Sequence, residues 1–286
     1  MGPADPPALR TLVSTAALAE HLRDPDWVVV DCRHDLFKPE AGREAYAKSH
    51  IPGARFMQLD SDLAGEKTGT NGRHPLPDPA VFATILGAAG IGESRQVVAY
   101  DSQESVNASR LWWMLRWLGH DAVAVLDGGW RRWVEEERPY SAEIPRPAPT
   151  IFSPRPRGGY VDVQFVLSHL DDPKMFVLDA RSPARFRGES EPIDPVAGRI
   201  PGSANRFYRD NFDEQCCFKP AAQLGAEFEA LLAGRPVEHV VHSCGSGVST
   251  CHNMLAMEIA GLTGSRLFPG SWSEWCADPS RPVARG

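Results

Sequence analysis

The chain has 286 residues, of which 42% are hydrophobic, and this is enough for two packed cores of ordinary size. Its formal net charge is −7, and Lys and Arg form no stripe that could neutralise a phosphate backbone, so nucleic acid is not an expected partner. No stretch approaches the roughly 18 apolar residues of a membrane span, and the first residues lack the pattern of a secretory signal. We therefore expect a cytoplasmic protein without membrane contact.

Six cysteines are too sparse in a chain of this length for a disulfide scaffold, and no C-x-x-C pair indicates zinc. Reduced thiols are expected. His242, Cys244, Cys251 and His252 could be considered as metal ligands, but their spacing matches no zinc site and alternate strand residues point to opposite faces. We predict no metal and no cofactor.

The two halves of the chain repeat the same succession of motifs, and such self-similarity is a strong indication of architecture. The first half contains VVVDCR at 28–33, SHIPGA at 49–54, VVAYD at 97–101 and VAVLDGGW at 123–130. The second half contains FVLDAR at 176–181, GRIPGSA at 198–204, VVHSC at 240–244 and RLFPGSW at 266–272. Two domains of the same fold are therefore expected.

Within each half, short apolar runs alternate with longer helical patterns. The runs at 27–30, 97–100 and 237–241 lack polar alternation, as is typical of strands buried on both faces. The helical patterns cover residues 16–22, 79–89, 108–118 and 221–233. Strands that alternate with helices predict two α/β domains, each built on a parallel sheet.

A proline-rich stretch separates the halves, with the sequence SAEIPRPAPTIFSPRPRGG between about residues 140 and 159. Proline breaks regular structure and favours a semi-rigid, extended connector. We therefore predict a first domain at 1–140, a linker at 141–159 and a second domain at 160–286, with the boundary near residue 150.

Cys244 is the candidate reactive group. It ends an apolar strand and precedes a glycine-containing turn, which leads into a helical pattern at 251–260. Ligands bind at the carboxyl ends of strands in open parallel sheets, and small loop residues let successive backbone N–H groups face one anion. These amides and the following helix favour the thiolate, which is the nucleophilic form. The alternative is a buried structural thiol.

The sequence CGSGV followed by STCH resembles the active-site loop of the 3-mercaptopyruvate sulfurtransferases of the rhodanese superfamily. The resemblance extends to SHIPGA, to SRLWW at 109–113, to LDGGW, to RFRG at 185–188 and to GSWSEW at 270–275. It implies two tandem rhodanese-like domains, each a parallel sheet flanked by helices. It also implies that Cys244 takes sulfur from 3-mercaptopyruvate as a persulfide, releases pyruvate and passes the sulfur to thioredoxin, glutathione or cyanide. The first domain of that family lacks the cysteine, and here Asp101 stands in its place.

The same resemblance implies a Ser-His-Asp set made of Ser246, His74 and Asp60, with the last two contributed by the first domain. A carboxylate that orients an imidazole, which in turn polarises a hydroxyl, can stabilise or protonate a developing enolate. The alternatives are an exposed turn histidine and a surface aspartate. Sequence spacing alone does not show that the three residues meet.

Arg185 matches the family arginine that binds the donor carboxylate, a task suited to two parallel guanidinium donors. The alternative is a solvated surface arginine. The implied donor site is completed by four loop residues, Gly245, Gly247, Val248 and Ser249. The segment that carries the second arginine of the family reads ESEPID at 189–194 and contains none, so Arg110, Arg187 and Arg199 remain open as substitutes.

Three rival functions remain. Thiosulfate as the donor would use the same persulfide chemistry, although Gly-Ser after Cys244 replaces the basic residues usual in thiosulfate sulfurtransferases. A cysteine-dependent phosphatase would need an arginine six positions after the cysteine, where Thr250 stands. A non-enzymatic pair of binding modules would not need the intact loop.

Overall fold

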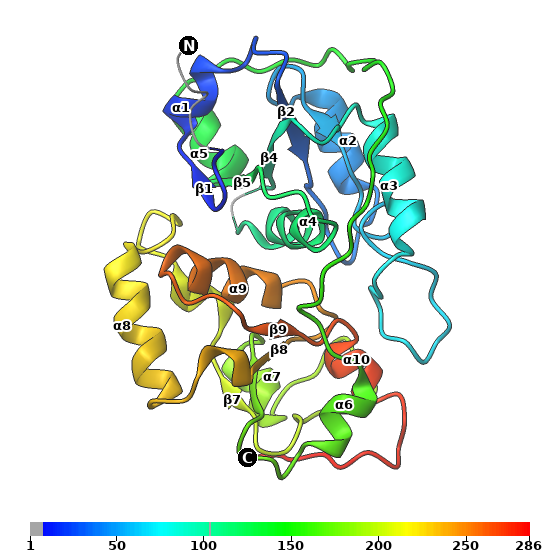
Figure 1. Cartoon of the computed structure of the whole chain (residues 1–286), viewed down its shortest axis with the longest axis vertical. Helices are drawn as coiled ribbons and strands as arrows, with labels where there is room; N and C mark the ends of the chain where they lie inside the picture. Colours follow the sequence, from blue (N-terminus) through cyan, green and yellow to red (C-terminus); the bar gives the residue numbers. More distant parts are fainter. Residues whose placement is uncertain (1–7, 103) are drawn as a thin grey trace. The chain divides into compact units, whose positions relative to one another are not determined.

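The computed structural model describes residues 8–102 and 104–286, and these divide into two compact units (Figure 1). The first unit contains the described residues up to Gln58 and those from Pro79 to Arg157. The second contains Leu59–Asp78 and Gly158–Gly286. A segment from the first half of the sequence therefore belongs to the second unit.

The first unit is built on a parallel sheet whose described strands follow the order β1-β5-β4-β2-β3. Its strands are β1 (Leu12–Val13), β2 (Trp27–Asp31), β3 (Arg55–Phe56), β4 (Gln96–Tyr100) and β5 (Val123–Leu126). Its helices are α1 (Thr15–Glu20), α2 (Ala41–Lys48), α3 (Pro79–Ala88), α4 (Val106–Trp117) and α5 (Gly129–Glu135). All five residues of β4 are buried, as expected for a strand covered on both faces by helices.

The second unit repeats this plan with the strand order β7-β6-β8-β9, again parallel. Its strands are β6 (Phe176–Asp179), β7 (Ala204–Asn205), β8 (Val240–Ser243) and β9 (Arg266–Leu267). Its α-helices are α6 (Val163–Ser168), α7 (Pro183–Arg187), α8 (Ala221–Leu232), α9 (Thr250–Ile259) and α10 (Ser271–Trp275), and its 3₁₀ helices are η1 (Tyr208–Asn211) and η2 (Val237–His239). Helices flank each sheet in Figure 1. The predicted α/β class with two parallel sheets is confirmed.

Element boundaries differ from the predicted ones mainly at one place. The apolar run at 237–241 predicts a strand from Val237, but Val237–His239 form η2 and the strand begins at Val240. Pro236, whose φ is −59°, precedes this turn, and its ring cannot continue a central ladder. The four predicted helices are present as α1, α3, α4 and α8, each within a few residues of its expected ends.

Matching ion pairs fix the same turn in both units. Asp31 at the end of β2 accepts hydrogen bonds from the backbone and guanidinium of Arg33, and Asp179 at the end of β6 does the same with Arg181. Arg33 lies 4.7 Å from the ring of Trp130, and Arg181 lies 4.9 Å from the ring of Trp272. These buried aspartates therefore hold the turn after the strand in each unit.

The proline-rich stretch is extended and lies along the first unit. The amide of Thr150 donates to the carbonyl of Gly87 at 2.9 Å, and the amide of Arg155 donates to that of Leu118 at 2.8 Å. The amide of Arg157 donates to the carbonyl of Trp117 at 2.8 Å. The stretch is therefore attached to the first unit as far as Arg157.

Candidate active site

Cys244 lies directly after β8, a strand paired on both sides, and its side chain is buried. Its amide donates to Ser271 Oγ at 3.1 Å, and its carbonyl accepts from the amide of Trp272 at 3.0 Å. The next carbonyl, that of Gly245, accepts from the amide of Ser273 at 2.9 Å. The start of α10 thereby fixes the beginning of the loop in one conformation.

Gly247 turns the loop toward α9. Its φ is +75°, a conformation that favours glycine, and a Cβ atom built on it would lie 2.1 Å from the carbonyl oxygen of Pro269. The thiol of Cys251, also buried, donates to the carbonyl of Gly247 at 3.4 Å. The Cys251 thiol therefore lies beneath the loop, at Gly247.

The matching loop of the first unit already holds an anion. The buried carboxylate of Asp101 accepts hydrogen bonds from the amides of Ser105, Asn107 and Ala108 at 2.8, 2.9 and 3.3 Å. Burial raises the pKa of Asp101 to about 6, although these amides oppose the shift. The loop of the first unit can therefore gather backbone donors around one anion, as we expect for the loop at Cys244.

The second unit brings Ser246, His74 and Asp60 together. His74 Nδ1 lies 2.8 Å from Ser246 Oγ, and His74 Nε2 lies 3.4 Å from Asp60 Oδ1. A carboxylate beside Nε2 favours the tautomer with its proton on Nε2, which leaves Nδ1 to accept from the serine hydroxyl. His74 is buried and Asp60 is partly buried, so neither is the exposed residue of the alternative reading.

The segment Leu59–Asp78 carries both partners and belongs to the unit that contains Cys244, whereas the family resemblance assigns them to the first domain. Backbone contacts hold it there. The amide of Arg73 donates to Ser273 Oγ at 3.0 Å, and a Cβ atom built on Gly72, whose φ is +85°, would lie 2.8 Å from the carbonyl oxygen of Gly270. The loop that carries His74 and the helix α10 that fixes Cys244 therefore contact each other.

Arg185 lies on α7 and is not the solvated arginine of the alternative reading, because its side chain is only 17% exposed. Its Nε and Nη2 donate to Glu191 at 3.1 and 2.7 Å, and Nη2 also donates to Asp194 at 3.2 Å. A Cβ atom built on Gly245 would lie 3.5 Å from Nη1 and Nη2 of Arg185. The guanidinium therefore lies beside the residue that follows Cys244.

Arg187 and Arg199, two of the arginines left open as substitutes for the second one, pair with groups outside the loop at Cys244. Arg187 is 46% exposed and pairs with Glu189, and residues 183–187 form the helix α7. Arg199 donates to the carbonyl of Gly286, and its guanidinium lies 4.7 Å from the ring of Phe186. Arg110 is buried in α4 of the first unit.

Arg73 is the arginine that sequence reasoning missed. Its Nη1 pairs with Asp194, and its Nη2 would lie 2.9 Å from a Cβ atom built on Gly245. The signal in the sequence is its position directly before His74, but it lies in the opposite half of the chain from the segment where an arginine was expected.

The carboxylates that pair with Arg73 and Arg185 belong to Asp194 and Glu191. Burial raises the pKa of Asp194 above its usual value, although Arg73 and Arg185 oppose the shift. Burial also opposes ionisation of Glu191, but hydrogen bonds from Arg185 and from the amides of Asp194 and Ile193 lower its pKa. The segment that lacks an arginine thus supplies the acidic residues that hold arginines from other segments.

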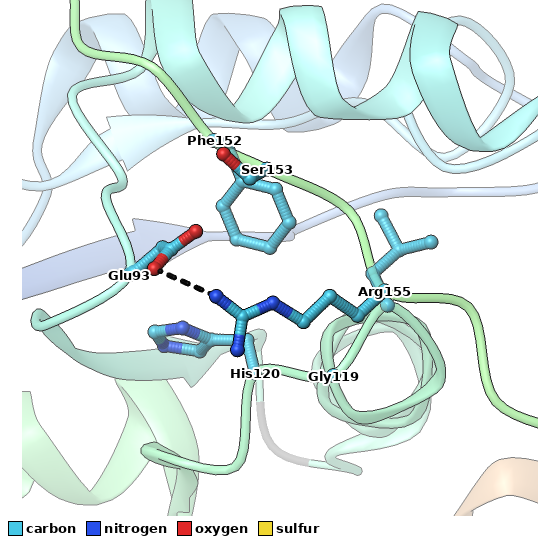
Figure 2. A pocket seen from close by; sticks show the side chains of 7 residues that line it. Glu93, Gly119, His120, Phe152, Ser153 and Arg155 are labelled. Atoms are coloured by element: carbon cyan, nitrogen blue, oxygen red, sulfur yellow. Dashed lines mark hydrogen bonds and ion pairs between the residues drawn. The ribbon is translucent and has the colours of Figure 1, made fainter.

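A separate hollow of about 120 Å³ lies in the first unit, lined among others by His120 and Phe152. Figure 2 shows Arg155 reaching across it toward Glu93, to which it donates at 3.3 Å. His120 Nε2 is buried there without a hydrogen-bond partner among the described residues. The charges lining this hollow pair with each other, and no cysteine lines it.

Two further findings concern residues 8–102 and 104–286. No helix in these ranges is long and apolar enough to cross a membrane. No group of three or more His, Cys, Asp or Glu side chains in them is arranged to hold a metal ion.

The two units share a parallel α/β fold and an Asp-Arg turn after one strand. The second unit also has a cysteine in a tight, glycine-containing loop. These features define a class of proteins with two copies of one domain, of which the second copy carries the cysteine. A model of the rhodanese-like domain matches residues 14–136 and 162–278. The chain belongs to this family of rhodanese-like proteins.

Relatives match over nearly the whole chain. The probable 3-mercaptopyruvate sulfurtransferase of Pseudomonas aeruginosa is 45% identical over 278 residues, which cover 96% of this chain and 98% of that protein. The putative thiosulfate sulfurtransferase SseB of Mycobacterium tuberculosis is 35% identical over 285 residues, which cover 97% and 98%. The solved structure of SseA of Escherichia coli, described as a 3-mercaptopyruvate sulfotransferase, superposes with a TM-score of 0.79 at 28% identity and covers 91% of this chain and 98% of its own.

Proposed function

We propose that this protein is an enzyme that transfers sulfur from 3-mercaptopyruvate to a thiol acceptor through a persulfide on Cys244. The single observation that carries the proposal is the contact of 2.8 Å between His74 and Ser246, two residues after a cysteine in a family loop. It adds a proton-handling pair to the nucleophile. The 45% identity to a probable 3-mercaptopyruvate sulfurtransferase supports the same donor.

In the first step, the Cys244 thiolate attacks the sulfur of 3-mercaptopyruvate. A sulfur–sulfur bond forms, the carbon–sulfur bond breaks, and its electron pair leaves as the enolate of pyruvate. Arg185 holds the donor carboxylate, because a guanidinium offers two parallel donors to a planar anion. Gly245, Gly247, Val248 and Ser249 shape the loop around the sulfur.

The enolate is a strong base, so its release is favoured when a proton reaches it. For this step His74 must carry a proton on Nδ1 as well as on Nε2, so that Nδ1 donates to Ser246 Oγ and the hydroxyl is free to donate to the enolate. When the Ser246 proton passes to the enolate, the Nδ1 proton replaces it, and His74 is left neutral with its proton on Nε2; the thiol proton of the donor, lost as the persulfide becomes an anion, balances this transfer. Asp60 holds the imidazole, and Lys67 pairs with Asp60 at 2.7 Å, which limits the negative charge beside the ring.

In the second step, an acceptor thiolate, or the carbon of cyanide, attacks the outer sulfur of the Cys244 persulfide and regenerates the Cys244 thiolate, as in other ping-pong reactions with a covalent intermediate. Thioredoxin, glutathione or cyanide are the acceptors that we propose, in a cytoplasmic setting. Thioredoxin has a second thiol, which would release the sulfur as hydrogen sulfide with formation of its own disulfide.

The second candidate function uses thiosulfate as the donor. It is supported by the 35% identity to a putative thiosulfate sulfurtransferase and by the absence of an arginine in the segment 189–194. With thiosulfate as the donor, the Ser246–His74 pair would have no proton to deliver, because sulfite departs from thiosulfate without taking up a proton.

The test is the ratio of kcat/KM for 3-mercaptopyruvate and thiosulfate, measured with one acceptor and with Cys244→Ser as the blank. We expect a preference for 3-mercaptopyruvate of at least about tenfold, and no turnover in the blank. A preference for thiosulfate would establish the second candidate. Inactivity with both donors, and no added sulfur on Cys244 by mass spectrometry, would favour a non-enzymatic binding module.

A further inference from the structure

Lys67 and His74 share one carboxylate oxygen. Lys67 Nζ donates to Asp60 Oδ1 at 2.7 Å, and His74 Nε2 lies 3.4 Å from the same oxygen. All three residues belong to the segment Leu59–Asp78 of the second unit. The ammonium group and the imidazole therefore face the same acceptor, and the ammonium group is the nearer of the two.

The turn that carries Lys67 is held by hydrogen bonds of its own. The amide of Thr68 donates to Asn71 Oδ1 at 2.9 Å, and Asn71 Nδ2 donates to the carbonyl of Glu66 at 2.9 Å. These bonds hold the residues on either side of Lys67 in the chain. The backbone is thus already ordered, so only the side chain of Lys67 loses freedom when it pairs with Asp60.

The charge on Asp60 determines how strongly His74 holds a proton. A nearby carboxylate favours the imidazolium, and a cation bound to that carboxylate weakens the effect. The two contacts, laid end to end, place Lys67 Nζ no more than about 6 Å from His74 Nε2. At that distance, one unit charge in water changes the pKa of a neighbouring group by about 0.5 unit, and by more in less polar surroundings.

Several charged or titratable groups lie near the pair formed by His74 and Ser246. They come from its own segment, from the loop after β8 and from α7, and they are Asp60, Lys67, Arg73, Cys244 and Arg185. Arg73 and Arg185 pair with Asp194. Removal of the Lys67 ammonium group therefore changes the charge at Asp60 and leaves the arginine contacts in place.

We infer that Lys67 is a positioning residue that tunes the proton affinity of His74 by holding the Asp60 oxygen that the imidazole faces. In the proposed cleavage of 3-mercaptopyruvate, His74 gives a proton to Ser246, and a proton donor works best when its pKa lies near the working pH. Asp60 alone would hold that proton more tightly, and Lys67 offsets part of this attraction. The inference rests on the proposed function and deepens it, because it assigns a residue that sets the upper pH limit of the step.

Two competing interpretations give Lys67 no effect on the proton. The Lys67 side chain is 47% exposed, and many exposed ion pairs contribute nothing measurable. A solvated lysine of this kind would leave the titration of His74 unchanged when it is removed. A lysine that only braces the segment would lower activity at every pH, also without a change in that titration.

The experiment measures the pKa of the His74 ring by NMR of the whole protein with isotope-labelled histidine, and His74→Gln identifies the signal. Low ionic strength is used, because salt screens exposed pairs. We expect Lys67→Met to raise this pKa by at least about 0.5 unit, because the Asp60 carboxylate then acts on the ring without an opposing charge. Lys67→Arg keeps the charge and should titrate as wild type. The matched control is Lys174→Met, which removes an exposed lysine in the turn before β6 of the same unit and should also titrate as wild type.

A rise smaller than about 0.5 unit in Lys67→Met, or an equal rise in Lys174→Met, would overturn the inference. With 3-mercaptopyruvate as the donor, kcat/KM should fall at a correspondingly higher pH in Lys67→Met than in wild type. Turnover that falls at an unchanged pH would also count against the inference. The titration needs no turnover, so a raised ring pKa in a protein inactive on 3-mercaptopyruvate would support the effect of Lys67 on His74 and contradict the proposed function alone.

Discussion

Ser246 is the residue that we expect to act differently on the two donors, because their leaving groups differ in their need for a proton. Cleavage of 3-mercaptopyruvate leaves an enolate that needs a proton, whereas cleavage of thiosulfate leaves sulfite, which does not. General acid catalysis by a positioned group contributes about 10²-fold or more. We therefore expect Ser246→Ala to lower kcat for 3-mercaptopyruvate about 100-fold and to change thiosulfate turnover by less than about threefold.

The matched control for this variant is Ser280→Ala, which removes an exposed hydroxyl that donates to Asp278 in the same unit. It should leave both activities unchanged. Equal losses with both donors in Ser246→Ala would mean that the serine supports the loop and does not handle a proton.

Alanine substitutions at Gly247 and Gly202 separate the energetic cost of backbone strain from the cost of a steric clash. Both have a φ of +75°, but a Cβ atom at Gly202 meets nothing within 4 Å, while one at Gly247 would lie 2.1 Å from the Pro269 carbonyl oxygen. Gly202→Ala should lower the free energy of unfolding by about 1 kcal/mol through the left-handed conformation alone. Gly247→Ala should cost about 2 kcal/mol more, because backbone must move. Urea unfolding of both variants measures the difference, and equal losses would show that the loop yields freely.

At the scale of elements, the strand-to-helix loop recurs in both units with a different side chain at its start. In the first unit, a carboxylate of the chain itself accepts the amides that follow β4. In the second unit, the corresponding position carries the thiol of Cys244. The same strand-to-helix loop therefore begins with a carboxylate in the first unit and with a thiol in the second.

The raised pKa of the buried Asp101 carboxyl group predicts how the stability of the protein depends on pH. Burial raises its pKa in the folded state to about 6, above the value of 3.8 expected when the chain is unfolded. Between these values the folded state binds more protons than the unfolded state, so this group's contribution to stability rises as pH falls. Between pH 7 and pH 5, wild type should gain about 1 kcal/mol relative to Asp101→Asn. Urea unfolding of both proteins at the two pH values tests this, and a constant difference would contradict it.

The elements themselves were predictable because their signals are local. Uninterrupted apolar runs marked β2 and β4, and the helical spacing at 221–233 marked α8. The predicted start of β8 at Val237 was wrong, because valine favours strands but the residues after Pro236 form a turn first. The helix α7 was not predicted, although proline at its first turn is compatible with a helix start.

At the scale of the whole molecule, the candidate site was predictable where it follows one stretch of chain. The loop from Cys244 to Ser249 could be read from its glycines and its strand. The position of Arg73 beside Gly245 could not be predicted, because it depends on the fact that the segment Leu59–Asp78 belongs to the second unit. The residues on either side of that segment belong to the first unit. Periodicity and spacing carry no information about such a long-range contact, and only the family resemblance pointed to His74 and Asp60.

The duplication also predicts that chemistry cannot be restored in the first unit by its nucleophile alone. Phe37 follows Asp31 at the same distance along the chain at which Arg185 follows Asp179, and its side chain is 74% exposed. The first unit thus has an anion-binding loop without this arginine. We expect the double variant Asp101→Cys/Cys244→Ser to gain no sulfur atom from 3-mercaptopyruvate, as measured by mass spectrometry of the intact protein. Wild type treated in the same way is the positive control, and circular dichroism checks that the variant is folded. A persulfide on the new cysteine would show that the loop alone suffices and that the arginines of the second unit are not required for attack on the donor.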